Sequence, residues 1–240
     1  MTNTKNSPIS SWAQWFDKAA ATFDDPRMKI AYYKNGKTGT PYSQHAVEAT
    51  HRDIFKKLAP ARDASILDIG CGVGYFTKTH AKKVKLIIGS DVSLHMIRSA
   101  RDLNPRGHFL VAQAYSLPFQ NETFDRIFSY GVTQYLPSQP TLQKMLKEML
   151  RLIKPHGRML IGDILEPVHQ SGRGSYNKTT QKGKRWWPKT LDHDLAKLYV
   201  SKQLFENFCK KNKLTCKFFS QHISGRAIPT PRYDVVIDCP

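Results

Sequence analysis

A glycine-rich turn follows the first apolar run of the chain and has the geometry of a ligand site. In the segment ILDIGCGVGYFT, Gly70, Gly72 and Gly74 alternate with other residues, and Asp68 precedes them. Such a turn between a strand and a helix exposes backbone N–H groups and lets a ligand approach the main chain closely. A second carboxylate, Asp91, ends the next apolar run in IIGSD. Both carboxylates are expected at the carboxyl ends of parallel strands, where open α/β sheets bind their ligands.

The spacing of the glycines indicates which kind of ligand fits. A dinucleotide turn of the form GxGxxG would need glycine at position 75 or 77, where the chain has Tyr75 and Thr77. The Lys-Ser or Lys-Thr pair of a phosphate-binding loop is also missing from the required place. A carboxylate such as Asp91 can accept both hydroxyls of a ribose. The pattern therefore favours a nucleoside cofactor without a pyrophosphate over NAD or ATP. In the competing interpretation, Asp68 and Asp91 cap the turn and the helix that follow them.

The elements that must position these residues alternate along the chain. Short apolar runs bounded by glycines are typical of buried parallel strands, and the helical patterns between them predict an open α/β sheet. The last two runs are joined by a loop, which predicts an antiparallel hairpin at one edge. Expected strands cover 65–69, 84–89, 108–113, 124–130, 158–164, 214–223 and 232–240, with helices at 93–103 and 140–153.

The first sixty residues differ from this pattern. Trp12, Trp15, Phe16 and Phe23 recur at helical spacing, with Ser10 or Ser11 as a possible cap, and a second amphipathic helix ends before Pro60. We expect residues 1–60 to form a helical lid or collar and residues 61–240 to form the ligand-binding domain.

The amino-acid composition limits which binding partners and which cellular compartment fit this chain. A net charge of +18 favours an acidic partner, such as a phosphorylated or carboxylated substrate, RNA or an anionic membrane surface. The four cysteines show no CxxC spacing, which fits a reducing compartment. Neither a signal peptide nor a membrane-spanning run is evident in the sequence, so a soluble cytoplasmic protein is expected.

Five segments in order carry a resemblance to a known family. DIGCGVG, GSDVS, LPF at 117–119, FDRIFSYGVTQYL and LKEMLRLIKPHGRMLIGD lie between residues 65 and 163. Together they resemble the class I S-adenosylmethionine-dependent methyltransferases, and they are most similar to the small-molecule enzymes of the ubiquinone-biosynthesis type. The resemblance implies a Rossmann-like, seven-stranded, mostly parallel sheet whose last strand is antiparallel. It also implies S-adenosylmethionine as the cofactor.

The resemblance also implies the site residues. The third segment departs from the usual Gly-Asp-Ala, because Gln113 replaces the carboxylate expected to accept from the adenine amino group; its amide oxygen can still accept. The end of the fourth strand, residues 129–135, would lie beside the transferred methyl, and SYGV there disfavours methylation of a base amine. The expected cofactor-binding residues are Asp68, Gly70, Cys71, Gly72, Gly74, Asp91, Val92, Met96, Gln113, Ala114 and Tyr130.

Two residues are candidates for the chemistry itself. Tyr135 lies at the end expected to face the acceptor, and His193 stands between two aspartates that could orient its imidazole as a general base. A surface histidine at a helix start is the alternative interpretation of His193. Residues 166–199 are too long for an ordinary connection and predict a substrate-covering insertion; residues 167–191 hold six lysines or arginines and no acidic residue. No spacing predicts a metal site.

Three functions compete at this point. The favoured one is in-line methyl transfer to a small-molecule acceptor, O- or N-directed and possibly anionic. A tRNA-modifying methyltransferase of the wobble-uridine type is the rival, because the basic charge suits a phosphate backbone. A non-catalytic, cofactor-binding partner subunit is the third. The oligomeric state and the acceptor are left open by the sequence.

Overall fold

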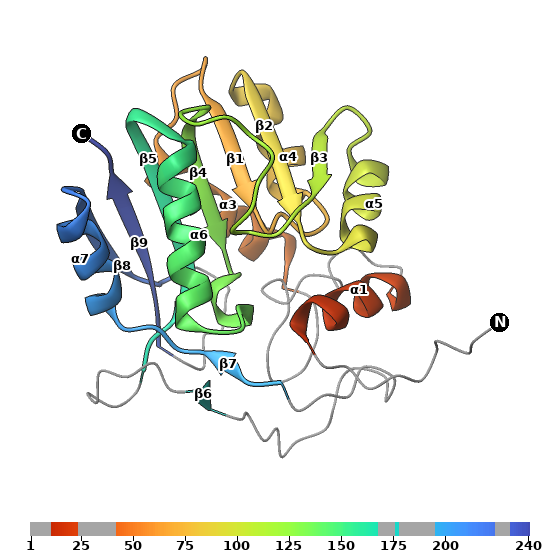
Figure 1. Cartoon of the computed structure of the whole chain (residues 1–240). Coiled ribbons are helices and arrows are strands. Elements are labelled where there is room, and N and C mark those ends of the chain that lie inside the picture. The colour runs from red at the N-terminus through yellow and green to blue at the C-terminus, as the bar shows by residue number, and fades with distance from the viewer. Residues whose placement is uncertain (1–10, 24–41, 168–175, 178–194, 224–230) are drawn as a thin grey trace.

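One sheet organises the part of the chain that the computed structural model describes, which is residues 11–23, 42–167, 176–177, 195–223 and 231–240. Its strand order is β3-β2-β1-β4-β5-β9-β8, and the first five strands in that order are parallel (Figure 1). Strand β9 runs antiparallel to both β5 and β8. The strands are β1 (Ser65–Ile69), β2 (Leu86–Asp91), β3 (His108–Val111), β4 (Phe124–Tyr130), β5 (Ile153–Leu165), β8 (Thr215–Ser220) and β9 (Arg232–Asp238).

The predicted architecture is confirmed: the sheet has seven strands, the last is antiparallel, and β8 and β9 form the expected edge hairpin. Several boundaries differ from the prediction, and two of the differences have a local cause. Strand β5 begins at Ile153, directly after a helix, so its paired part is longer than the apolar run 158–164. Strand β3 ends at Val111, because Gln113 turns back to form an isolated bridge with Ser116.

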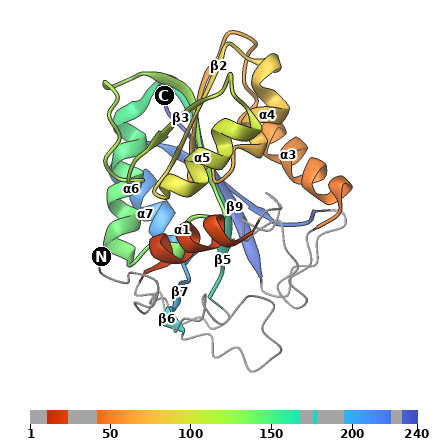
Figure 2. The same cartoon turned by 90° about the vertical axis from the view of Figure 1, so that its right-hand side faces the viewer.

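Helices cover both faces of this sheet (Figure 2). On one face, α6 (Gln139–Leu152) and α7 (Lys202–Lys211) pack on the largest core cluster, which includes Leu146, Phe205 and Ile161. On the other face, α3 (Gln44–Leu58) and α4 (Tyr75–His80), which continues into the short η3 (Ala81–Lys83), contribute Ile54 and Phe76 to a second cluster. Helix α5 (Leu94–Leu103) packs beside β2 and β3.

Serine side chains cap the N-termini of four helices. The side chains of Ser11, Ser43, Ser93 and Ser138 each accept a hydrogen bond from the backbone N–H three residues later. Such N-caps satisfy a donor that the helix itself leaves unpaired. Ser11 is thus the cap of α1 (Trp12–Thr22), in agreement with the expected helix start.

Helix α1 lies at the carboxyl ends of the parallel strands (Figure 1). A short ribbon formed by β6 (Tyr176–Asn177) and β7 (Lys197–Leu198) lies at the same end, and η4 (Thr133–Tyr135) follows β4 there. Parallel α/β sheets bind ligands at this end. Among the residues that the structure describes, none of the helices combines the length and the apolar character needed to cross a bilayer.

Candidate functional site

The glycine-rich turn is fixed to the neighbouring strands. The backbone N–H groups of Gly70 and Cys71 both donate to the carbonyl oxygen of Ser90, at 2.7 and 2.9 Å. Gly70 has a φ of +78°, and a Cβ there would lie 2.3 Å from a methyl carbon of Val132. Only glycine fits a left-handed position against so close a neighbour. The requirement for glycine at this position therefore comes from the segment after β4 as well as from the turn.

Asp91 closes the other side of the turn. Its Oδ2 accepts from the Gly72 N–H at 3.0 Å and its Oδ1 from the Ser93 N–H at 2.9 Å. Burial raises the pKa of Asp91 above 3.8, although the backbone donors Ser93 and Gly72 oppose that shift. A carboxylate has about four lone-pair sites, so each oxygen can accept one more hydrogen bond from a ligand. The helix cap in this region is Ser93, not Asp91.

Asp68 lies beneath the turn. It is buried on β1, and burial together with the Asp91 charge raises its pKa well above 3.8. Cys71 packs against Ile97 and Phe109, and Gly74 is the N-cap of α4. These three predicted residues support the turn from behind and are not part of the cavity wall described next.

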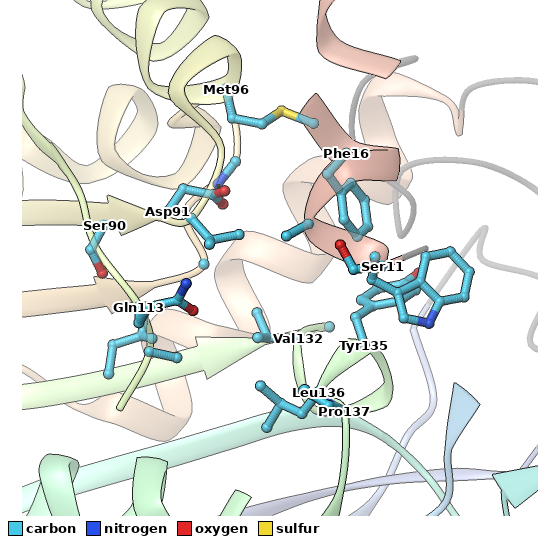
Figure 3. Close-up of a pocket in the computed structure, with 18 of the residues that line it drawn as sticks. Ser11, Phe16, Ser90, Asp91, Met96, Gln113, Val132, Tyr135, Leu136 and Pro137 are labelled. Carbon is cyan, nitrogen blue, oxygen red and sulfur yellow. Dashed lines mark hydrogen bonds between the residues drawn. The ribbon is translucent and has the colours of Figure 1, made fainter. Parts of the chain in front are cut away.

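A cavity of about 540 Å³ opens in front of the turn (Figure 3). That volume lies within the ~300–1,000 Å³ range of small-molecule sites. Its wall combines the turn, the ends of β2, β3 and β4, the start of α1 and the segment before β7. The lining residues are Ser11, Trp12, Ala13, Phe16, Ile69, Gly70, Gly72, Ser90, Asp91, Val92, Met96, Ala112, Gln113, Ala114, Tyr115, Tyr130, Gly131, Val132, Tyr135, Leu136, Pro137, Leu195 and Ala196.

Most of the predicted site residues meet at this cavity. Met96, one of the expected cofactor-binding residues, is 1% exposed and still lines the wall. His193 and most of the 166–199 insertion lie outside the described residues. The predicted residues that line the cavity are Gly70, Gly72, Asp91, Val92, Met96, Gln113, Ala114, Tyr130 and Tyr135.

An aromatic cluster forms the part of the wall that faces α1. The ring centroids of Trp12 and Phe16 each lie 4.8 Å from that of Tyr135, in edge-on arrangements. The indole N–H of Trp12 donates to the carbonyl oxygen of Ala196 at 2.8 Å. Sequence reasoning placed Trp12 and Phe16 on an amphipathic helix but did not assign them to the site. The helical spacing of these aromatics was the available signal, and nothing in the sequence pointed to Ala196.

Tyr130 is held from behind by a buried polar chain. Its hydroxyl oxygen accepts from Gln221 Nε2 at 2.7 Å, and the same nitrogen donates to Asp234 Oδ1 at 3.0 Å. Asp234 Oδ2 in turn pairs with Lys57 Nζ at 2.6 Å. The strand end that borders the cavity is thereby connected to α3.

Two tests indicate that a nucleoside-sulfonium cofactor fits this site. The turn places Gly70 and Gly72 on the cavity wall, and Asp91 offers two oxygens with spare acceptor capacity beside them. The amide of Gln113 lies on the same wall, where it can accept from an amino group. Within the described residues, no group of three or more His, Cys, Asp or Glu side chains is arranged to hold a metal ion.

Comparison with known proteins identifies methyltransferases as relatives of this chain. Residues 67–161 match a family described as "Methyltransferase domain". A malonyl-[acyl-carrier protein] O-methyltransferase of Salmonella typhimurium is 32% identical over 124 residues, which are 51% of this chain and 48% of that protein. A tRNA (carboxymethyluridine(34)-5-O)-methyltransferase of Saccharomyces cerevisiae is 34% identical over 107 residues, 45% of this chain and 37% of that protein.

A solved structure shows the same fold over nearly the whole chain. Phosphoethanolamine N-methyltransferase 1 of Haemonchus contortus, in complex with phosphoethanolamine and S-adenosylhomocysteine, superposes with a TM-score of 0.65 at 16% identity. The match covers 95% of this chain and 48% of that one. The chain spans about half the length of the curated relatives that it matches.

One class of protein is defined by the sheet order, by the glycine-rich turn with its two carboxylates and by these matches. The chain contains a class I S-adenosylmethionine-dependent methyltransferase domain, and S-adenosylmethionine is its cofactor.

Proposed function

We propose that this chain transfers the methyl group of S-adenosylmethionine to a carboxylate oxygen of a small acceptor, which forms a methyl ester. The observation that carries methyl transfer is the cavity that joins the Gly70–Gly72 turn and Asp91 to the aromatic wall of Trp12 and Tyr135. Cofactor and acceptor can meet there under α1. The names of the Salmonella and yeast relatives support a carboxylate, because both denote O-methylation and include a carboxyl-bearing group, malonyl or carboxymethyl.

The residues of this chain would bind, orient and exclude water. Asp91 would accept the ribose hydroxyls, Gln113 the adenine amino group, and Trp12, Phe16 and Tyr135 would shield the reacting atoms. The bound cofactor supplies a methyl on a sulfonium: as the acceptor oxygen forms the new O–C bond, the C–S bond breaks and sulfur keeps the electron pair. A carboxylate is already deprotonated near neutral pH, so this reaction needs alignment and dehydration more than a base.

Residues 1–60, the 166–199 insertion, His193 and Tyr135 would have separate roles around the acceptor. We infer that residues 1–60 act as a cover, which is supported by the contribution of α1 to the cavity wall. The basic 166–199 insertion would attract an anionic acceptor. His193 stays a prediction: a general base there would be needed for a hydroxyl acceptor and not for a carboxylate. Tyr135 is assigned to shielding and alignment.

A second candidate is a tRNA-modifying enzyme. Two observations favour it: the 34% identity to the yeast tRNA methyltransferase and the net charge of +18, which suits binding to phosphates. The methylated group in that case would be a carboxylate on a nucleoside, so the same transfer chemistry serves both candidates.

The deciding experiment uses S-adenosylmethionine labelled in its methyl group. The purified protein is incubated with host-cell extract, with or without prior ribonuclease treatment, and the products are separated into small-molecule, protein and RNA fractions. Each fraction is then treated with alkali, because methyl esters release volatile labelled methanol whereas N-methyl and ether products do not. An Asp91→Ala variant serves as the inactive control.

Alkali-volatile label in a ribonuclease-resistant small-molecule fraction would support the favoured function. Alkali-volatile label confined to RNA and lost after ribonuclease treatment would select the tRNA candidate. Label that resists alkali would show that the acceptor atom is not a carboxylate oxygen. Cofactor binding without transfer to any fraction would point to the non-catalytic partner subunit.

A further inference from the structure

One short segment, residues 131–137, forms much of the cavity wall that would face the acceptor. It begins directly after β4 and includes η4, and its lining residues are Gly131, Val132, Tyr135, Leu136 and Pro137 (Figure 3). The Tyr135 N–H donates to the Val132 carbonyl oxygen at 2.8 Å. The Leu136 N–H donates to the Thr133 carbonyl oxygen at 3.2 Å. Such short, tight turns have poorer hydrogen-bond geometry than an α-helix, so the position of this segment depends on what holds it from outside.

Gln134 connects this segment to a distant strand. It does not line the cavity, it is 2% exposed, and its Oε1 accepts a hydrogen bond of 3.0 Å from Arg232 Nη1. Arg232 is the first residue of β9, which lies two strands away from β4 in the sheet. The side chain of Arg232 therefore spans the end of β5 to reach the segment that follows β4.

Arg232 is itself fixed by the end of β5. Its Nη1 donates to the Asp163 carbonyl oxygen at 3.2 Å and pairs with Asp163 Oδ2 at 3.0 Å. The two side chains are 14% and 1% exposed, so water screens the pair only weakly. Asp163 has a φ of +59° where the register between β5 and β9 shifts, and its N–H donates to Asp234 Oδ1 at 2.8 Å. Irregularities of this kind re-aim side chains, and here the strand end directs two oxygens at one guanidinium nitrogen.

The start of the segment is held by the same strand end. The Gly131 N–H donates to the carbonyl oxygen of Gly162, the residue before Asp163, at 3.0 Å. Residues 131–137 are thus tied to the end of β5 twice, directly at Gly131 and through Arg232 at Gln134. The direct bond fixes where the chain leaves β4, and the second contact fixes η4, which carries Tyr135.

We propose that Arg232 is a positioning residue for methyl transfer: by holding Gln134 it sets the place of Tyr135 and thereby the alignment of the acceptor with the transferred methyl. Arg232 does not line the cavity, so it acts through η4 and not on the substrates. A misplacement of about 1 Å can cost about a hundredfold in rate. The inference rests on the proposed function, because that function makes residues 131–137 the acceptor wall.

The cofactor side of the cavity is held by other contacts. The Gly70 N–H donates to the Ser90 carbonyl oxygen, and Asp91 accepts from the Gly72 N–H. Loss of the Arg232 contact should therefore slow transfer and leave cofactor affinity nearly unchanged. A general loss of stability would instead weaken both.

Three measurements on the full chain test this role, and only one of them requires turnover. Affinity for S-adenosylhomocysteine is measured by calorimetry. Hydrogen–deuterium exchange with S-adenosylhomocysteine bound, read by mass spectrometry, reports on the backbone of residues 131–137. Transfer of labelled methyl from S-adenosylmethionine to host-cell extract reports the rate.

The variants remove the contact from either side. Arg232→Met removes the guanidinium, and Gln134→Met removes the acceptor oxygen while the pair between Arg232 and Asp163 stays in place. The control Arg158→Met breaks the ion pair of Arg158 Nε with Asp238 Oδ1, 2.6 Å long, at the other end of β9.

We expect exchange within residues 131–137 to be about tenfold faster in Arg232→Met and Gln134→Met, the effect of losing one charge-assisted hydrogen bond. Transfer should be slower by about tenfold or more, with S-adenosylhomocysteine affinity within about threefold of the wild type. Arg158→Met should match the wild type in all three measurements. If Arg232→Met does not fold, Gln134→Met decides.

Three results would overturn the positioning role. The first is wild-type exchange in Gln134→Met, and the second is an equal effect of Gln134→Met and Arg158→Met. The third is faster exchange with a wild-type rate of transfer, because the position of η4 would then not matter to the reaction. Failure of the proposed function has a separate signature: the wild type transfers no label to any fraction, and the exchange of Gln134→Met alone then supports or contradicts the hold of Arg232 on η4.

Discussion

The carboxylate of Asp17 on α1 accepts a hydrogen bond of 2.6 Å from the hydroxyl of Ser93, the N-cap of α5. The same carboxylate accepts from the His95 backbone N–H at 3.1 Å and contacts His95 Nδ1 at 2.9 Å. Ser93 follows Asp91 by two residues and donates its own N–H to Asp91. A carboxylate at a helix N-terminus is stabilised by the exposed N–H groups and the helix dipole. One contact therefore ties the helix that covers the cavity to the carboxylate that would hold the ribose.

Replacing Asp17 should loosen α1 and weaken cofactor binding. We expect Asp17→Asn to lower the affinity for S-adenosylhomocysteine by about three- to tenfold, because loss of a charge-assisted contact costs about 1 kcal/mol. Calorimetry measures the change, and Asp102→Asn, an exposed carboxylate on the same α5, is the control. Equal affinity of Asp17→Asn and wild type would show that α1 docks without this contact.

The same contact predicts a pH dependence of stability. Burial raises the pKa of Asp17, but the hydrogen bonds from Ser93 and His95 outweigh it and leave the pKa below 3.8. A lowered folded-state pKa adds stability that is present above the unfolded value and is lost as pH falls through the folded value. The difference in melting temperature between wild type and Asp17→Asn should therefore be constant from pH 7 to about 5 and shrink below about pH 4. A difference that grows on acidification would contradict this assignment.

Cofactor affinity should depend on the ionisation of Asp91. Because burial raises the pKa of this carboxylate above 3.8, its protonation begins at a higher pH than for an exposed aspartate. Ribose hydroxyls donate best to the ionised form, so affinity should fall as pH is lowered through that raised pKa. Calorimetric titrations of S-adenosylhomocysteine between pH 8 and 4.5 measure the decline. Asp91→Ala should abolish binding at every pH, and unchanged affinity of this variant would remove Asp91 from the site.

The turn should not tolerate a side chain at position 70. Gly70→Ala places a methyl group 2.3 Å from Val132 and forces a non-glycine residue to a φ of +78°. We expect loss of S-adenosylhomocysteine binding and a loss of about 2 kcal/mol in unfolding free energy, from strain and steric overlap together. Adding Val132→Ala removes the overlap and leaves the strain, so the double variant should recover only part of the stability. Wild-type binding by Gly70→Ala would contradict the close approach of Val132.

Tyr135 should act through its ring. Its ring contacts Trp12 and Phe16, so we expect Tyr135→Phe to keep most of the cofactor affinity and transfer rate. Tyr135→Ala should lower both, because truncating an aromatic side chain removes contacts worth about 1 kcal/mol or more with its aromatic neighbours. Parallel binding and labelled-transfer assays measure the two variants. A large loss of transfer rate in Tyr135→Phe with unchanged binding would instead assign the hydroxyl a direct role.

The ion pair behind Tyr130 should carry much of the stability of this side of the sheet. Asp234 is fully buried and pairs with Lys57, whose side chain is 11% exposed. Lys57→Met would leave Asp234 without its cation and should cost about 3 kcal/mol in urea unfolding. Lys56→Met, one residue earlier and exposed, should change stability by less than about 0.5 kcal/mol. Similar values for the two variants would contradict a structural role for the pair.

Local patterns were enough to predict the sheet and the cofactor end of the site. Apolar runs bounded by glycines correspond to the buried strands, and the positions of Asp68, Gly70 and Asp91 follow from where those strands end. The reason is that a turn and a strand end are set by neighbours within a few residues. The family resemblance added the identity of the cofactor, which the residues alone restricted only to a nucleoside without a pyrophosphate.

The side of the cavity that would face the methyl acceptor could be described only from the tertiary structure. Trp12, Tyr135 and Ala196 meet at one wall although they come from three distant parts of the chain. Neither hydropathy nor spacing encodes which loops pack over a sheet, since that choice depends on side-chain fit summed over the whole fold. The sequence by itself determined the fold and the cofactor turn, and the packing of α1 and of the segment before β7 determined the shape of the acceptor side.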